Sequence, residues 1–260
     1  MNTISDNPSL FQSSLLGSLR GIVVHSLIFP LEVIKVRQQC APITKTSYQI
    51  AFKIFQTEGM GSFYRGLKPQ LLTTVSKQVW CWPLITHLPL FLQSKGLAEP
   101  PKQAITGLTI STVDAAITTP LSRATLLSAA SCQKPPSIAA IYKEGWKGFF
   151  TYWTKLTVAW SSFLVAQKLF RDQERTDHQQ RLNIPQLMKV AIKVSVLVSV
   201  CLTPFDLVNT LKQTEHRSLN QLFKGNVFKN LYRGWPVTLL CLTIHNVASI
   251  ILIERLDGLK

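Results

Sequence analysis

Six stretches of this sequence are mostly apolar and close in length to the thickness of a bilayer. A helix needs about 20 such residues to cross the hydrocarbon core, and 46% of the 260 residues are hydrophobic. Every stretch also carries polar residues, a pattern typical of a bundle whose interior faces water. The sequence therefore predicts an all-α membrane protein with six transmembrane helices, over Leu10–Phe29, Leu67–Leu92, Ala104–Ala130, Phe149–Phe170, Ile184–Val208 and Trp235–Ile253.

Three prolines indicate an internal repeat. Pro30, Pro120 and Pro204 each lie late in an apolar stretch, 90 and 84 residues apart. A proline inside a helix removes a hydrogen bond and bends the helix, which a membrane bundle tolerates only with local compensation. Their near-equal spacing predicts one domain over residues 1–260, built from three repeats over residues 10–92, 104–170 and 184–257.

Small residues recur at matched positions before these prolines. They lie thirteen and nine residues upstream in each repeat, and such pairs let helix backbones approach closely in a membrane. We therefore expect tight helix–helix contacts at Gly17 and Gly21, at Gly107 and Ser111, and at Ala191 and Ser195.

A third pattern follows the odd-numbered stretches. Glu58-Gly59 precedes the aromatic-basic-glycine triplet Tyr64-Arg65-Gly66, and the last repeat has Tyr232-Arg233-Gly234. The middle repeat keeps Glu144-Gly145, and there we interpret Phe150-Thr151-Tyr152 as replacing the triplet.

The segment between proline and triplet is amphipathic. In Tyr48–Phe55, the side chains of Ile50, Ile54 and Phe55 are expected on one side. This predicts a helix that lies along the membrane surface.

Charge and motif content exclude several functions. The formal charge is +15, but the basic residues lie between the apolar stretches and at their ends, which suits lipid headgroups and an anionic solute better than nucleic acid. Five scattered cysteines give neither a disulfide framework nor a metal site. The sequence has no glycine-rich phosphate loop, His-Glu metal pair or nucleophile motif, so we expect no enzyme and no cofactor. The first ten residues carry no basic residue, so no leader peptide is expected.

The combination Pro-x-acidic-x-x-basic, amphipathic segment, acidic-Gly and aromatic-basic-Gly resembles the mitochondrial carrier family. Repeat one carries it from Pro30 to Gly66, and the resemblance extends from about Leu10 to Glu254. It implies three helix–surface helix–helix units around a pseudo-threefold axis, in a monomer of the mitochondrial inner membrane. A small anionic solute would bind halfway across, alternately open to each side, and membrane lipids including cardiolipin would be partners.

The resemblance also implies two gates. After the prolines, the paired positions are Glu32 with Thr125, Ser122 with Asn209, and Asp206 with Lys35, and only the last is a full ion pair. In the second pair both members are neutral, so no charge is stranded there. At the opposite side the matching positions include Asp172, Arg175 and Glu254, which predict a weak or differently built gate.

Solute contacts are implied seven, eight and eleven residues past each triplet and five residues before Pro30. A lysine and two histidines at these positions are costly in a membrane unless they face water or a ligand. Trp160 could stack on a nucleobase, although packing is the stronger reading for this tryptophan, and His25 could equally bond a neighbouring helix. The predicted contacts are His25, Thr73, Lys77, Ala159, Trp160, Phe163, Cys241 and His245.

Two functions follow from these patterns. The first is transport of an anionic metabolite by alternating access, with an ATP- or ADP-like nucleotide favoured over other phosphorylated or carboxylate metabolites. The second is a carrier-like membrane adaptor or scaffold that no longer transports. The altered second repeat and the poor second gate are the features that favour the adaptor.

Overall fold

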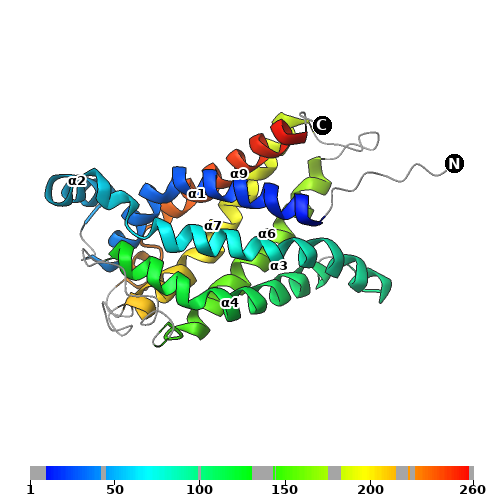
Figure 1. Ribbon diagram of the computed structural model, residues 1–260, viewed down its shortest axis with the longest axis horizontal. Helices are drawn as coiled ribbons and strands as arrows, with labels where there is room; N and C mark the ends of the chain where they lie inside the picture. Colours follow the sequence, from blue (N-terminus) through cyan, green and yellow to red (C-terminus); the bar gives the residue numbers. More distant parts are fainter. Residues whose placement is uncertain are drawn as a thin grey trace.

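The computed structural model describes residues 10–41, 45–98, 101–130, 143, 145–174, 183–214, 222 and 226–257. Within these residues the chain is helical and contains no strand, which confirms the predicted all-α class. Six helices of 23 to 31 residues dominate and run roughly along the long axis (Figure 1). They are α1 (Leu10–Cys40), α3 (Leu67–Ser94), α4 (Pro101–Ala130), α6 (Phe149–Glu174), α7 (Ile184–Thr214) and α9 (Trp235–Asp257).

Five of the six long helices begin at the first residue of an apolar stretch, α4 begins three residues earlier at Pro101, and α1, α4 and α7 continue past their prolines. The structure places Pro30, Pro120 and Pro204 inside α1, α4 and α7. The prediction that the first helix ends at Phe29 is therefore wrong, because α1 continues to Cys40. A proline deletes one hydrogen bond of the helix, a loss that a helix bundle tolerates with local compensation.

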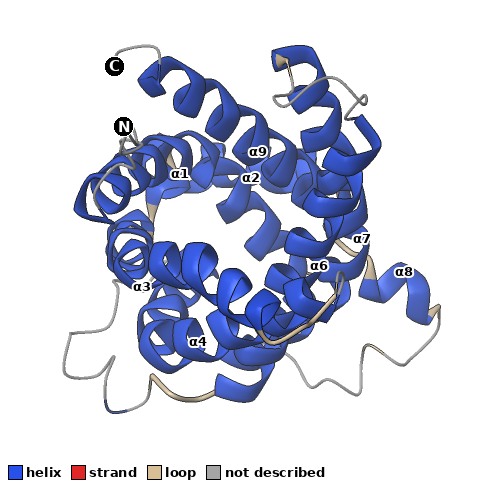
Figure 2. Cartoon of the chain, turned by 90° about the vertical axis from the view of Figure 1, so that its right-hand side faces the viewer, coloured by secondary structure: helices blue, strands red, loops and turns tan. Residues whose placement is uncertain are grey.

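The six long helices form a closed ring (Figure 2). Each packs against its two neighbours in the order α1, α3, α4, α6, α7 and α9, and α9 returns to α1. The proline-containing helices α1, α4 and α7 also contact one another in pairs across the ring. These three helices are therefore in direct contact with one another.

Glycine permits two of the closest helix contacts. A Cβ added to Gly107 of α4 would lie 2.7 Å from the backbone nitrogen and Cα of Ser161 in α6. A Cβ added to Gly21 of α1 would collide with the Cγ2 atom of Thr74 in α3. Both contacts are of the kind expected from small residues in membrane helices.

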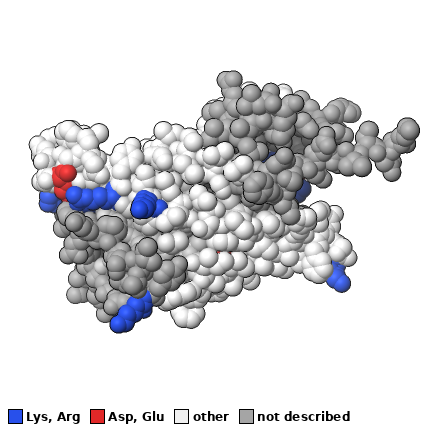
Figure 3. Space-filling model, viewed as in Figure 1, with Lys and Arg blue, Asp and Glu red and all other residues white. Residues whose placement is uncertain are grey.

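The bundle exposes apolar side chains and buries polar ones. Leu15, Leu19, Val23 and Leu27 form an exposed stripe along α1, each 47–65% exposed. Inside, α4 and α7 bury serine, threonine, asparagine and aspartate side chains. On the face shown in Figure 3, the described Lys and Arg atoms lie towards the ends and leave the middle uncharged. Large exposed apolar surface of this kind marks an interaction with a membrane or a partner protein.

In the described part of the chain one helix, Ile184–Thr214, is both long enough and apolar enough to cross a membrane. Polar residues lower the hydropathy of the other long helices, and in α4 many of these residues are buried.

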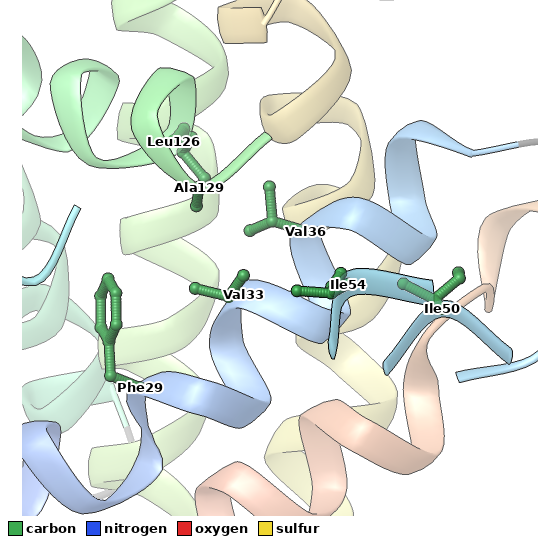
Figure 4. Packing of buried hydrophobic residues seen from close by; sticks show 7 residues of the cluster. All are labelled: Phe29, Val33, Val36, Ile50, Ile54, Leu126 and Ala129. Atoms are coloured by element: carbon green, nitrogen blue, oxygen red, sulfur yellow. The ribbon is translucent and has the colours of Figure 1, made fainter. Parts of the chain in front are cut away.

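A short helix packs across the end of α1. Helix α2 (Ser47–Glu58) is capped at its N-terminus by Thr46, whose hydroxyl accepts from the backbone N–H of Gln49. Its residues Ile50 and Ile54 are buried against Val33 and Val36 (Figure 4). The prediction for Phe55 is wrong, since this side chain is 53% exposed; one residue on from Ile54 turns a helix by about 100°.

Two further short helices lie in the connections between the long helices. Helix α2 is followed by the 3-10 helix η1 (Met60–Tyr64), and α8 (Val227–Leu231) precedes α9 in the third repeat. The corresponding segment of repeat two, residues 131–142, lies outside the described residues.

Candidate functional site

Asp206 is the centre of a charged cluster where α1, α6 and α7 meet. Its Oδ2 atom lies 3.1 Å from Nζ of Lys35 and accepts a hydrogen bond of 3.1 Å from Nε2 of Gln39. Its Oδ1 atom lies 2.6 Å from Nζ of Lys155. Asp206 is 2% exposed, so two cations hold one buried anion. The structure thus brings the sequence-predicted partners Lys35 and Asp206 together.

The other predicted partners near the prolines have different neighbours. Glu32 lies 4.0 Å from Nδ1 of His25. The hydroxyl of Thr125 donates to the carbonyl of Leu121 in its own helix. Asn209 accepts a 3.4 Å hydrogen bond from Thr151, and Ser122 lies in α4. One full ion pair among the predicted positions is therefore seen at this end.

The second predicted gate is only partly described. Asp172 pairs at 3.6 Å with Lys168 of the same helix, and both side chains are exposed. Arg175 lies outside the described residues, and Glu254 lies in α9 with its side chain outside them.

Three glycines with positive φ occupy matching positions in the three predicted repeats. Gly66, Gly148 and Gly234 have φ of 95°, 82° and 84° and immediately precede α3, α6 and α9. Only glycine adopts this conformation readily. Trp146-Lys147-Gly148 is therefore the aromatic-basic-glycine triplet of repeat two, and the interpretation of Phe150-Thr151-Tyr152 as its replacement is wrong.

Each of these glycines faces the proline-containing helix of the next repeat. A Cβ on Gly66 would lie 2.9 Å from the carbonyl oxygen of Thr125 in α4, and one on Gly148 would lie 2.8 Å from Cγ of Gln213 in α7. A Cβ on Gly234 would lie 3.6 Å from Cγ of Lys35 in α1. The contacts run cyclically, from the start of α3 to α4, from the start of α6 to α7 and from the start of α9 to α1.

The corrected triplet shifts the alignment of α6 by four residues. The positions seven, eight and eleven past Gly148 are Lys155, Leu156 and Ala159. Lys155 is thus the counterpart of Thr73 and Cys241, and it was missed because its triplet was assigned too late in the chain. The signal was present in the sequence as Trp146-Lys147-Gly148.

The predicted solute contacts divide into charged and packed residues. Lys77 of α3 lies 3.7 Å from Oδ2 of Asp114 in α4, a partner that sequence reasoning did not identify. The ring centroids of His25 and His245 lie 5.4 Å apart, where α1 packs against α9. Thr73 donates to the carbonyl of Pro69, and Cys241 is buried.

The aromatic residues predicted on α6 belong to the packing between helices. Trp160 and Phe163 form an edge-to-face pair with ring centroids 6.4 Å apart. Both pack against a buried cluster that contains Cys81, Ile110 and Leu164. Ala159 packs against a second cluster with Ala166 and Val190. In this conformation the arrangement matches the packing interpretation of Trp160.

The first acidic-glycine motif forms a structural clamp. Arg37 contacts Glu58 with both terminal nitrogens, at 2.9 Å from Nη2 to Oε2, and its Nε donates to the carbonyl of Ala129 at 2.9 Å. Arg65 of the triplet donates to Oε2 of Glu58 at 2.9 Å. The clamp therefore joins α1, α2, the triplet and the end of α4, and such two-pronged pairs fix geometry strongly.

Replacing Glu58 with glutamine is expected to destabilise the protein, because two arginines lose their shared carboxylate. Charge-assisted hydrogen bonds contribute about 1.5–3 kcal/mol each, so the melting temperature in detergent should fall by several degrees. The control is Glu174→Gln, since Glu174 pairs with the exposed Lys193. Equal losses in the two variants would contradict a structural clamp at Glu58.

Part of the chain is similar to known carrier proteins. Residues 6–96 match the family model described as mitochondrial carrier protein. The mitochondrial adenyl nucleotide antiporter of Mus musculus is 39% identical over 64 residues, which cover 24% of this chain and 14% of the antiporter. The mitochondrial substrate carrier family protein A of Dictyostelium discoideum is 29% identical over 79 residues, covering 28% and 24%.

A third relative is a plastid protein. The thylakoid ADP,ATP carrier of Arabidopsis thaliana is 35% identical over 57 residues, covering 22% of this chain and 14% of the relative. The matched stretches thus span a quarter or less of each relative. The resemblance to the mitochondrial carrier family is confirmed by these matches, over the region that holds the first repeat.

Proposed function

We propose that the chain is a membrane carrier that moves a small anionic solute by alternating access. In this proposal the six long helices cross the membrane as three repeats related by a pseudo-threefold axis. The closed ring of helices supports it, as do the cyclic contacts of Gly66, Gly148 and Gly234. Apolar side chains on the outside and polar ones inside suit a bundle surrounded by lipid.

The Asp206 cluster is the observation that carries the proposal. It joins α1, α6 and α7 through buried charges, close to where the proline-containing helices meet. A buried ion pair is a costly way to hold helices together permanently, since apolar residues would do so as well or better. Contacts of this kind suit an interface that closes in one state and opens in another.

An anionic solute, with an adenine nucleotide favoured, suits the charges of the bundle. Lys35 and Lys155 both contact the carboxylate of Asp206, so two cationic groups meet at one point of the bundle. The three relatives described above include an adenyl nucleotide antiporter and an ADP,ATP carrier. The mitochondrial inner membrane is the proposed location. The proposed activity is transport and not catalysis.

A thermal-shift screen tests whether the protein binds such a solute. A ligand that binds the folded state alone raises the melting temperature by mass action. We expect ADP or ATP to raise it more than phosphate or tricarboxylates do, and Lys77→Ala to lose most of that shift. Lys168→Ala, on the exposed side of α6, serves as the matched control. Equal shifts in the two variants would contradict a role for Lys77.

A membrane adaptor that has lost transport is the second candidate. It is favoured by the sparse charges at the predicted gate, where Ser122, Thr125 and Asn209 are neutral. A weaker gate would suffice in a protein that never cycles. Folded protein that binds no member of the anion panel would favour this function.

A further inference from the structure

A buried acid lies at a position where the other repeats have valine. Asp114 precedes Pro120 by six residues, and the residues six before Pro30 and Pro204 are Val24 and Val198. Both valines are buried core residues, and Asp114 is 0% exposed. The fold therefore does not need a carboxylate at this position, and a buried carboxylate is costly without partners.

The partner of Asp114 is also particular to one repeat. Lys77 follows Gly66 by eleven residues, and the equivalent residues after Gly148 and Gly234 are Ala159 and His245. The two charges that break the repeat pattern thus face each other across α3 and α4. Their appearance together at one point in the bundle indicates a shared role.

One oxygen of the Asp114 carboxylate has no close hydrogen-bond donor in the described part of the chain. Thr118 donates to Oδ1 of Asp114 at 3.1 Å and also contacts the hydroxyl of Tyr152 at 3.2 Å. The Oδ2 atom lies 3.7 Å from Nζ of Lys77, and it accepts no hydrogen bond from the described residues. Buried acceptors are normally satisfied, and the Glu58 clamp shows close two-pronged geometry that this pair lacks.

We propose that Lys77 and Asp114 form a solute subsite of two opposite charges, which selects an anion that carries a hydrogen-bond donor near its anionic group. The inference rests on the proposed carrier function. Lys77, whose side chain is 24% exposed, binds the anionic group. Asp114 is 0% exposed in this conformation, and its Oδ2 atom accepts from an amino or hydroxyl group of the same solute when the bundle opens in the proposed transport cycle. A buried acceptor left unpaired by an analogue without that donor makes the site selective.

Matched ligand pairs in a thermal-shift titration test the selectivity. The pairs are glutamate against glutarate and ADP against pyrophosphate, in which the second member lacks the amino or hydroxyl donors of the first. The wild-type protein should bind the donor-bearing member of at least one pair about 10- to 100-fold more tightly. Asp114→Asn should lose most of that preference and still respond to both anions. Equal binding of both members by the wild type, or an unchanged preference in the variant, would overturn the proposal.

A double variant covers the case in which Asp114→Asn does not fold. Lys77→Ala with Asp114→Val removes both charges and installs residue types that the other repeats use at these positions. We expect it to melt within a few degrees of the wild type and to respond to no member of the panel. A purely structural ion pair predicts instead that its ligand response is retained, which would overturn the subsite. Anion binding without donor preference would leave the carrier function standing, whereas no anion response in the wild type would count against both.

Discussion

Replacing Asp206 with asparagine is expected to lower the free energy of unfolding by about 3–5 kcal/mol, because a buried ion pair that loses one partner leaves uncompensated charge. Two lysines depend on this one carboxylate, at 3.1 and 2.6 Å. The melting temperature of the detergent-solubilised variant gives the measurement. Asp172→Asn is the control, since its exposed pair with Lys168 should contribute at most about 0.5 kcal/mol.

A rescue experiment separates loss of charge balance from loss of shape. Adding Lys35→Met and Lys155→Met to Asp206→Asn removes the three charges that meet at Asp206. Replacing a complete buried pair with apolar residues is often neutral or stabilising, so the triple variant should melt above the single one. A triple variant that melts lower still would contradict the electrostatic account of this cluster.

Replacing Gly107 with valine is expected to separate α4 from α6 or prevent folding. The added Cβ would lie 2.7 Å from backbone atoms of Ser161, and a backbone cannot move aside as a flexible side chain can. Overpacking typically costs about 1–3 kcal/mol and more where the backbone must shift. The yield of folded protein and its melting temperature measure the effect.

Gly61→Val is the matched control for this change. No atom lies within 4 Å of a Cβ added to Gly61, and its φ is not positive. The control should therefore melt close to the wild type. If both variants melt alike, the close approach of α4 to α6 at Gly107 does not determine stability.

The sequence predicted the positions of the long helices well, because each apolar run is long enough to form one continuous helix. Five long helices, α1, α3, α6, α7 and α9, begin at the first residue of a predicted stretch. The C-terminal end of α1 was harder to predict, because polar residues after Pro30 face other protein groups rather than water. Gln39, for example, is buried and donates to Asp206.

The candidate site was only partly predictable, since two of its charged residues, Lys155 and Asp114, were missed for different reasons. Lys155 was missed because repeat two lacks the four residues that separate Gly59 from Tyr64 in repeat one, which moved its triplet earlier. Asp114 was missed because the other repeats have valine at its position. Its pairing with Lys77 depends on the packing of α3 against α4, which the spacing of residues along the chain does not encode.

Exchange of labelled ADP by the purified protein in liposomes tests the carrier function most directly. Liposomes loaded with unlabelled nucleotide should take up external labelled ADP in a saturable way, and a matched dicarboxylate should compete less well. Liposomes without protein and liposomes with the Lys77→Ala variant are the controls, and both should show little uptake. If folded wild-type protein takes up no member of a broad panel of anions above the protein-free level, the carrier function is contradicted and the adaptor function is favoured.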